Sequence, residues 1–456
     1  ALGGPREGHV SSWRTVLRLE WRILRRDRAA LAVLVLFAGL LLVAAFAGGR
    51  HNAVVATAQH TAVQAEQARV TELRKKLKML ANSTTTLASK DPRDPVWMGK
   101  AGAAKLIVLP PAPLAAVAVG QRDLHAQAVR VNTGTHLTSE KETETAMSGP
   151  TRLRTGAFDP AFLFVVLFPL VVIALSYELL SGERERGTLA MLLSQPVSQV
   201  SLVLGKAAAR AIVLGGVTLL FALVGLLAAG AEISASGAGL HMALYAAVLL
   251  SWAVFWFAAA VAVNAWGATS ERNALLLVGI WLVFVIVVPG LVQVVVEAVH
   301  PAPSRIEMLN EAREAAQDVQ RQLAGLQGRH DIDVKTKDYA KRVVAVQEQL
   351  ASRSAPVVKA HRDRLRERHE VLNLLRFVSP AIVVQLALED VAGSGAARHR
   401  RFEEQVDVFH KSFRDHFFAM IRTGQPFTSA DLEGLPTMAY VEEPPGQLVA
   451  RVGSGV

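Results

Sequence analysis

Few residues in this chain stand at spacings that would let them do chemistry together. The phosphate-binding pattern G-x-x-x-x-G-K-[ST] is absent, because the Gly205-Lys206 pair lacks both the upstream glycine and the hydroxyl residue that should follow. The chain also contains no cysteine, which removes disulfides and thiolate metal sites from consideration. We therefore expect this chain to contain no catalytic residue and to bind no cofactor of its own.

The histidines of the C-terminal third are the remaining candidates for a metal site. His399, Glu403 and His410 fall on one flank of a predicted helix, but the two histidines are eleven residues apart. At 1.5 Å per residue that separation is roughly 16 Å, whereas ligand bonds to one ion are about 2 Å long. With no cysteine and only eight methionines, a soft-metal site has little support. We expect packed or surface histidines and no bound metal.

One stretch combines residue types in a suggestive way: "SGERERGTLAMLLSQP", residues 181–196. Alternating acids and bases precede Gly187, and the Thr188 hydroxyl is predicted to cap a short apolar helix that ends before Pro196. An alternative interpretation is an interfacial amphipathic helix that touches only lipid headgroups. Its candidate contact residues are Glu183, Arg184, Glu185, Arg186, Gly187, Thr188, Leu189, Leu192, Leu193 and Pro196.

The elements that position this stretch are predicted membrane spans. Hydrophobic residues make up 51% of the 456 residues, and the mean hydropathy is +0.30. The charged residues gather in blocks between uncharged runs about 20 residues long, which is typical of an integral membrane protein. The run 105–120 is not counted as a span, since three clustered prolines would break a lipid-exposed helix there. Spans are predicted at 29–48, 158–177, 207–230, 240–265 and 274–299.

The flanking charges predict an orientation. Residues 1–28 carry seven arginines against three acids, so they are predicted to form an interfacial helix on the cytoplasmic side. Alternation then places the loop 178–206 inside, and two insertions, 49–157 and 300–456, outside. Five spans leave the C-terminus outside, and a sixth span is expected beyond Val456.

Two further cytoplasmic positions are candidate contacts with a partner. Glu20 interrupts the apolar side of the N-terminal helix, so we expect it to pair with a neighbouring arginine or to reach a partner protein. The turn between the last two spans offers Glu271, Arg272 and Asn273, although a solvated turn explains these residues as well. The spans themselves contain almost no ionisable residue, so the relay that an ion-driven transporter needs is missing.

The region after Pro301 reads as long polar helices, one of them interrupted or kinked near Pro356. A shorter helix is predicted to begin with Ser379 as its cap and Pro380 in its first turn. The last long helix carries an apolar stripe that should be its buried face. The stripe consists of Phe402, Val406, Phe409, Phe413, Phe417 and Met420.

These features together resemble one known family. The run "YELLSGERERGTLAMLLSQPVSQVSLVLGK" is similar to the hallmark segment of type-2 ABC transporter permeases, with an acidic step, Gly-Thr, leucines, proline and Gly-Lys in that order. The two insertions, with "PLAAVAVGQRDLHAQAVRV" and "FVSPAIVVQLALEDVAGSGAARHRRFEEQV", resemble a NosY-like subgroup of the multicopper-enzyme maturation type.

The resemblance implies an all-α polytopic membrane protein of the bacterial inner membrane, a permease half with largely helical extracytoplasmic domains. It implies that residues 183–196 form a coupling helix that docks on a P-loop ATPase, which would hold the ATP and Mg. It also implies a second permease half, identical or different, and leaves export or mechanical work on a periplasmic protein open. No nucleic acid is expected as a partner. The alternative is a membrane-anchored sensor or scaffold that binds a partner without transport.

Overall fold

The computed structural model describes residues 9–81, 90–120, 122, 126–134, 158–194, 198–228, 237–266, 269–328 and 337–454. Within these residues, five helical segments are long and apolar enough to cross a membrane. They confirm the five predicted spans and the prediction of a largely helical, multi-pass membrane protein. The segments are Arg28–Leu80, Pro160–Glu185, Gln199–Leu227, Ala238–Ala265 and Ser270–Val299.

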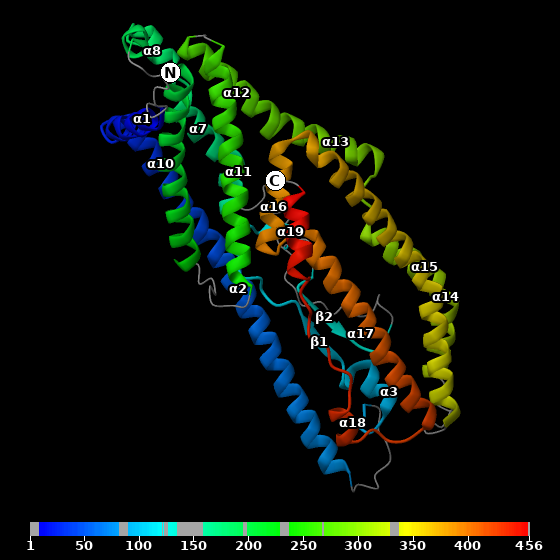
Figure 1. Ribbon diagram of the computed structural model, residues 1–456. Coiled ribbons are helices and arrows are strands. Elements are labelled where there is room, and N and C mark those ends of the chain that lie inside the picture. Colours follow the sequence, from blue (N-terminus) through cyan, green and yellow to red (C-terminus); the bar gives the residue numbers. More distant parts are fainter. Residues whose placement is uncertain are drawn as a thin grey trace, which may run out of the picture.

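The first span is part of a single helix, α2 (Arg28–Leu80), that continues far beyond its apolar part (Figure 1). It begins at Asp27, whose carboxylate accepts hydrogen bonds from the backbone N–H groups of Ala29 and Ala30. A short helix, α1 (His9–Leu24), precedes it. The sequence after Gly48 turns polar without a glycine–proline break, so the helix leaves the span without ending.

In two of the other spans a π-helical segment ends two residues before a proline. The second span runs α6 (Pro160–Phe162), η5 (Leu163–Leu167) and α7 (Phe168–Ser176), and Pro169 stands in the first turn of α7. The fifth span runs α12 (Ser270–Trp281), η6 (Leu282–Val287) and α13 (Val288–Val299), with Pro289 in the same position. A wider turn before proline accommodates its missing N–H, and α13 follows α12 along the same slope in Figure 1.

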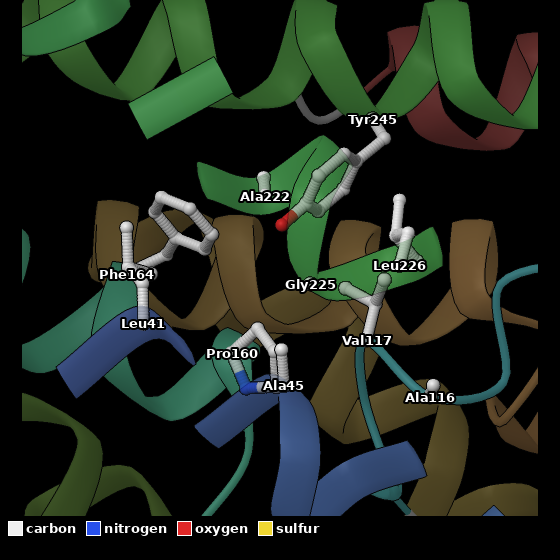
Figure 2. Close-up of a pocket in the computed structure, with 10 residues that line it drawn as sticks. All are labelled: Leu41, Ala45, Ala116, Val117, Pro160, Phe164, Ala222, Gly225, Leu226 and Tyr245. Atoms are coloured by element: carbon white, nitrogen blue, oxygen red, sulfur yellow. The ribbon is translucent and has the colours of Figure 1, made fainter. Parts of the chain in front are cut away.

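The spans pack closely where α2, α10 (Gln199–Ala228) and α11 (Ala238–Ala265) meet η5. Figure 2 shows Tyr245 and Phe164 in this contact, where the remaining cavity measures only about 10 Å³. A Cβ added at Gly225 would lie 2.4 Å from the Cβ of Ala45, so glycine allows α10 to approach α2 this closely. The Trp252 and Trp281 indoles donate to the Phe164 and Val166 carbonyls at 2.8 and 2.9 Å, which ties α11 and α12 to η5.

Beyond the spans, the chain builds an elongated second region, which we call the arm. Its long members are the far half of α2, α14 (Arg305–Gly328), α15 (Lys337–Leu375) and α17 (Ala396–Thr423), as Figure 1 shows. Pro356 lies inside α15, which continues through it. Short elements fill the space between them: α3 (Pro95–Trp97), η2 (Met98–Gly102), α18 (Ser429–Glu433) and an antiparallel strand pair, β1 (Lys105–Val108) with β2 (Ala128–Val131), in the register Lys105 to Val131.

The core of the arm confirms the predicted stripe on α17. Phe402, Val406, Phe409, Phe413 and Phe417 are buried against β1, α2 and α18, and Met420 is partly buried beside them. The proline-containing run 105–120, which was not counted as a span, forms β1 and is mostly buried after that strand.

A short apolar helix, α16 (Pro380–Ala392), joins the arm to the spans, together with η7 (Arg376–Val378) and α19 (Pro445–Gly453). Ser379 occupies the N-cap position and Pro380 the first turn, as predicted, but the cap itself is different. The Ser379 hydroxyl makes no bond to the N–H groups of α16 and donates instead to the Phe284 carbonyl of η6. At the other end of α16, His241 Nδ1 lies 2.7 Å from the Val391 carbonyl.

Candidate functional site

The charged stretch after the second span folds into two short helices, α8 (Ser181–Glu185) and α9 (Leu189–Leu193). We call residues 177–194 the α8–α9 segment. The turn between the helices depends on Gly187, whose φ of +72° is a left-handed conformation that side chains with a Cβ adopt at a cost. The chain thereby reverses direction and brings Thr188 back over Glu183.

Thr188 does not act as the predicted cap. It stands at the N-cap position of α9, but its hydroxyl makes no bond to that helix. The hydroxyl instead donates to the carboxylate of Glu183, and the Thr188 N–H donates to the Glu183 carbonyl at 3.0 Å. The backbone of Thr188 is helical (φ −82°, ψ −14°) and not extended as in a capping residue, and its hydroxyl is directed toward the Glu183 carboxylate.

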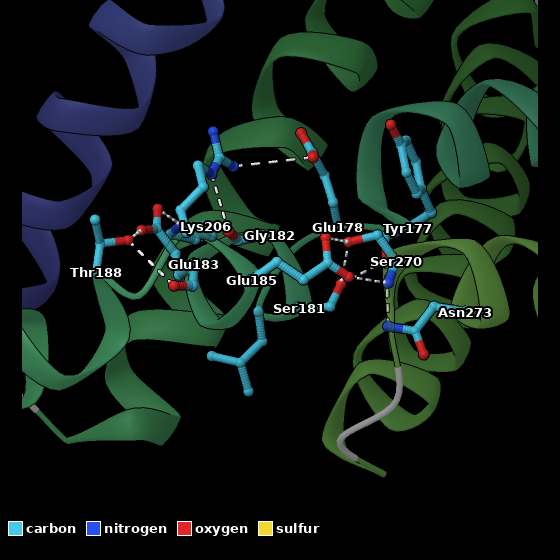
Figure 3. A network of polar contacts seen from close by, with 12 residues as sticks. Tyr177, Glu178, Ser181, Gly182, Glu183, Glu185, Thr188, Lys206, Ser270 and Asn273 are labelled. Carbon is cyan, nitrogen blue, oxygen red and sulfur yellow. Dashed lines mark hydrogen bonds and ion pairs between the residues drawn. The ribbon is translucent and has the colours of Figure 1, made fainter.

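Glu183 connects the α8–α9 segment to the third span (Figure 3). Its other carboxylate oxygen lies 2.9 Å from the Nζ of Lys206 on α10, and the Lys206 side chain is only 7% exposed. A buried ammonium requires nearby acceptors, so Lys206 fixes where Glu183, and with it α8, can lie against α10.

Glu20 completes this charge cluster from the other side. Its carboxylate is 3.5 Å from Lys206 and 3.8 Å from Arg210, and Glu20 is 2% exposed. The predicted pairing with an arginine is present, but the arginine lies on α10 and not on the N-terminal helix. Because the side chain is buried against this chain's own residues, Glu20 is not available for the direct partner contact that its position suggested.

Glu185 connects the segment to the fifth span. Its carboxylate accepts hydrogen bonds from the backbone N–H of Ser270 at 2.7 Å and from the Ser270 hydroxyl at 3.1 Å, as Figure 3 shows. The same hydroxyl lies 2.8 Å from that of Ser181. Ser270 is the first residue of α12, so the carboxylate also interacts favourably with the N-terminal end of that helix.

The second predicted contact, the turn before α12, divides into exposed and buried residues. Glu271 and Arg272 are exposed. Asn273 is fully buried, and its amide donates to the Tyr177 carbonyl at 3.4 Å and to Asn264 at 3.3 Å. Asn264 in turn donates to the Ser176 carbonyl at 3.1 Å. The prediction of a surface contact is therefore wrong for Asn273, whose amide is used to hold α7, α11 and α12 together.

The apolar residues of α9 have two different environments. Leu189 and Leu192 pack partly against Val16 of α1 and Leu202 of α10. Met191, in contrast, is 71% exposed. The exposed residues of the α8–α9 segment are Arg184, Glu185, Arg186, Gly187, Ala190, Met191 and Ser194, and Glu185 is exposed even though its carboxylate bonds Ser270. The side chain of Leu193 and the whole of Pro196 lie outside the described residues.

Sequence reasoning did not assign a role to Lys206, Arg210, Ser270 or Met191. A signal for the first two was available, because Lys206 and Arg210 are four residues apart and must share one face of α10, just before its apolar run. Ser270 follows Thr269 in a helix-start pattern, yet nothing in the sequence indicates that Glu185 reaches it.

Comparison with known proteins follows this geometry. The family model described as ABC-2 family transporter protein matches residues 14–435. Over 134 residues the chain is 28% identical to the probable ABC transporter permease protein NosY of Stutzerimonas stutzeri, a match that covers 28% of this chain and 47% of that protein. The chain thus spans about half the length of that relative. No solved structure matches the chain. By the family model, which covers nearly all of the spans, the α8–α9 segment and the arm, this chain is a membrane protein of the ABC-2 transporter family.

Proposed function

We propose that the α8–α9 segment is the coupling element of this transporter subunit, which docks on a cytoplasmic P-loop ATPase through its exposed face. One observation carries the proposal. The segment presents Arg184, Arg186 and Met191 outward, while Glu183 and Glu185 tie it to two separate spans, α10 and α12. A push on the exposed face would therefore reach both spans through short, charge-assisted contacts.

In this proposal the ATPase subunit binds and hydrolyses ATP with Mg, and this chain does neither. The N-terminus and the α8–α9 segment lie on the cytoplasmic side of a bacterial inner membrane, and the arm lies outside. A second permease half, identical or different, pairs with this one. ATP-driven movement of the spans either exports a substrate or does mechanical work on a protein bound to the arm.

The test is site-specific photocrosslinking in membranes that contain the complete transporter. A benzophenone amino acid at Met191 is expected to crosslink to a protein that carries the G-x-x-x-x-G-K-[ST] pattern, as identified by mass spectrometry. Met79 is the matched control, because it is an equally exposed methionine, 78% accessible, at the far end of α2. Crosslinks to the ATPase from Met79 and not from Met191 would overturn the proposal.

A second experiment reverses the charge of the exposed arginines. Replacing both Arg184 and Arg186 with glutamate should abolish co-purification of the ATPase in mild detergent while the permease itself stays folded. Both side chains are exposed; that of Arg184 makes no hydrogen bond or ion pair among the described residues, and that of Arg186 makes only local ones, to the Gly182 carbonyl at 2.9 Å and to Glu178 at 3.9 Å. Glu183 and Glu185 are unsuitable for this purpose, because charge reversal there would break the internal contacts to Lys206 and Ser270. Undiminished co-purification of the double variant would count against docking at this face.

A further inference from the structure

A membrane-depth groove lies between α1, α2 and α10, away from the α8–α9 segment. It encloses about 500 Å³ and is apolar along most of its length. Leu31, Val35 and Leu42 line it from α2, and Val217 and Phe221 line it from α10. Gly39 adds open space, because a Cβ at this position would have no atom within 4 Å. The groove therefore has the character of a site for a hydrocarbon chain.

The end of this groove nearest α1 has a different character. Trp21, 45% exposed, and the guanidinium of Arg25 line it there. Tryptophan is typical of the headgroup level of a bilayer, and arginine extends its charge toward phosphate while its stem stays in apolar surroundings. The groove thus combines an apolar channel with one cationic end.

The positive charge at this end has no counterion from the described part of the chain. The exposed arginines around the end of α1 have no ion-pair partner among the described residues; they are Arg18, Arg22, Arg25, Arg26 and Arg28. The two acids nearby are already engaged, since Glu20 faces Lys206 and Arg210, and Asp27 accepts bonds from the first N–H groups of α2. An occupant with a negative charge and an apolar tail satisfies both parts of the groove.

We propose that this groove binds one anionic phospholipid, with its phosphate at Arg25, its glycerol at the level of Trp21 and an acyl chain along Leu31, Val35 and Phe221. The site does not depend on the identity of the ATPase or of the transported substrate. It does have a structural consequence, because the lipid would touch α1, α2 and α10 at once. Since Glu20 of the same α1 helix contacts Lys206, a bound lipid would stabilise α1 in the position that completes the charge cluster.

The experiment measures quenching of Trp21 fluorescence by phospholipids brominated on the acyl chain, with the intact protein in vesicles. The chain has seven tryptophans, so the signal of Trp21 is taken as the difference between the unchanged protein and Trp21→Phe. We expect brominated phosphatidylglycerol to compete about fivefold better for this site than brominated phosphatidylcholine, because one arginine near anionic lipid contributes about 1 kcal/mol.

Two pairs of variants define the site. Arg25→Gln should remove the preference for the anionic lipid, whereas Arg22→Gln, which changes an exposed arginine outside the groove, should retain it. Gly39→Leu should fill the groove and reduce quenching by both lipids. Gly279→Leu is the matched control, since its added side chain also enters open space, but on α12.

Several outcomes would overturn the proposal. Equal competition by the two lipids would mean that the groove holds only bulk lipid, and an unchanged preference in Arg25→Gln would place the anionic contact elsewhere. A second copy of the chain is the other possible occupant. Because the chain has no cysteine, Val35→Cys tests this directly: disulfide-linked dimers in native membranes would show that a protein covers the groove.

Discussion

The carboxylate of Glu183 on the α8–α9 segment lies 2.9 Å from the ammonium group of Lys206, seven residues into the helix of the third span. Lys206 is shared, because the buried carboxylate of Glu20 lies 3.5 Å from the same nitrogen. One cation thus links α1, α8 and α10. This arrangement makes the position of the proposed docking segment dependent on a group that the partner cannot touch.

Removal of the shared cation should be strongly destabilising. Lys206→Met leaves the Glu20 carboxylate buried with Arg210 as its remaining counterion, and a broken buried pair costs about 3 kcal/mol or more. We expect a lower thermal midpoint of the detergent-solubilised protein. Adding Glu20→Gln removes the carboxylate that has lost Lys206, but it also leaves the buried Arg210 guanidinium without Glu20, so at most a small part of the loss should be recovered. Lys359→Met, at an exposed lysine of the arm, is the control and should change little. Equal midpoints for Lys206→Met and Lys359→Met would contradict the assignment.

Loss of the bond between Glu185 and α12 should have a smaller effect. Glu185→Ala removes the acceptor for the N–H and hydroxyl of Ser270, at a cost of about 1 kcal/mol. Glu185→Gln should cost less, since its amide oxygen can still accept one of these bonds. Thermal unfolding in detergent gives the comparison, with Arg184→Ala as the matched control in the same helix. The prediction fails if alanine and glutamine at position 185 are equally tolerated.

The contact between α2 and α10 predicts a compensating pair of substitutions. Gly225→Ala would bring two methyl groups 2.4 Å apart at Ala45, so the helices must separate, at a cost of about 1–3 kcal/mol. Ala45→Gly removes the opposing methyl group and should restore most of the stability of Gly225→Ala. Gly216→Ala, which enters open space on the same helix, should be harmless. Thermal midpoints of the two single variants and of the double variant test this. If the loss of the double variant equals the sum of the two single losses, the contact between Ala45 and Gly225 is not the cause.

His410 should make the arm sensitive to acid. Burial, more than any other cause, lowers the pKa of this imidazole below its ordinary value of 6.5, although the contact of its Nε2 with the Gly134 carbonyl opposes the shift. The unfolded chain therefore binds the proton more readily than the folded one. The stability contribution is complete above about pH 6.5 and is lost as the pH falls from there through the pKa of the folded protein.

The measurement compares thermal midpoints at pH 7.5 and 5.5. His410→Asn should show a smaller loss between the two pH values than the unchanged protein does. His60→Asn, at an exposed histidine on α2, is the control and should show the same loss as the unchanged protein. A loss that is the same in His410→Asn would mean that other groups cause the acid sensitivity.

The sequence by itself determined the spans and the place of the α8–α9 segment between two of them. Apolar runs of membrane length have no alternative to helix, because a backbone in lipid must satisfy its own hydrogen bonds. The stripe on α17 was readable for a related reason, since phenylalanines at helical spacing need a buried face. The order of the residues from Glu183 to Pro196 likewise indicated the family without any knowledge of contacts.

Only the tertiary structure decided which of those residues face outward. Glu183 and Asn273 looked like surface groups, yet they bond Lys206 and Tyr177, which lie 23 and 96 residues away in the chain. Glu185 is exposed, as expected, but its carboxylate also bonds Ser270, 85 residues away. Pairings across such distances depend on how the spans pack, and local periodicity carries no information about that. For the same reason the Ser379 hydroxyl makes no cap bond and donates instead to the Phe284 carbonyl, 95 residues away. The Thr188 hydroxyl is a local case, since it donates to the carboxylate of Glu183 only five residues before it.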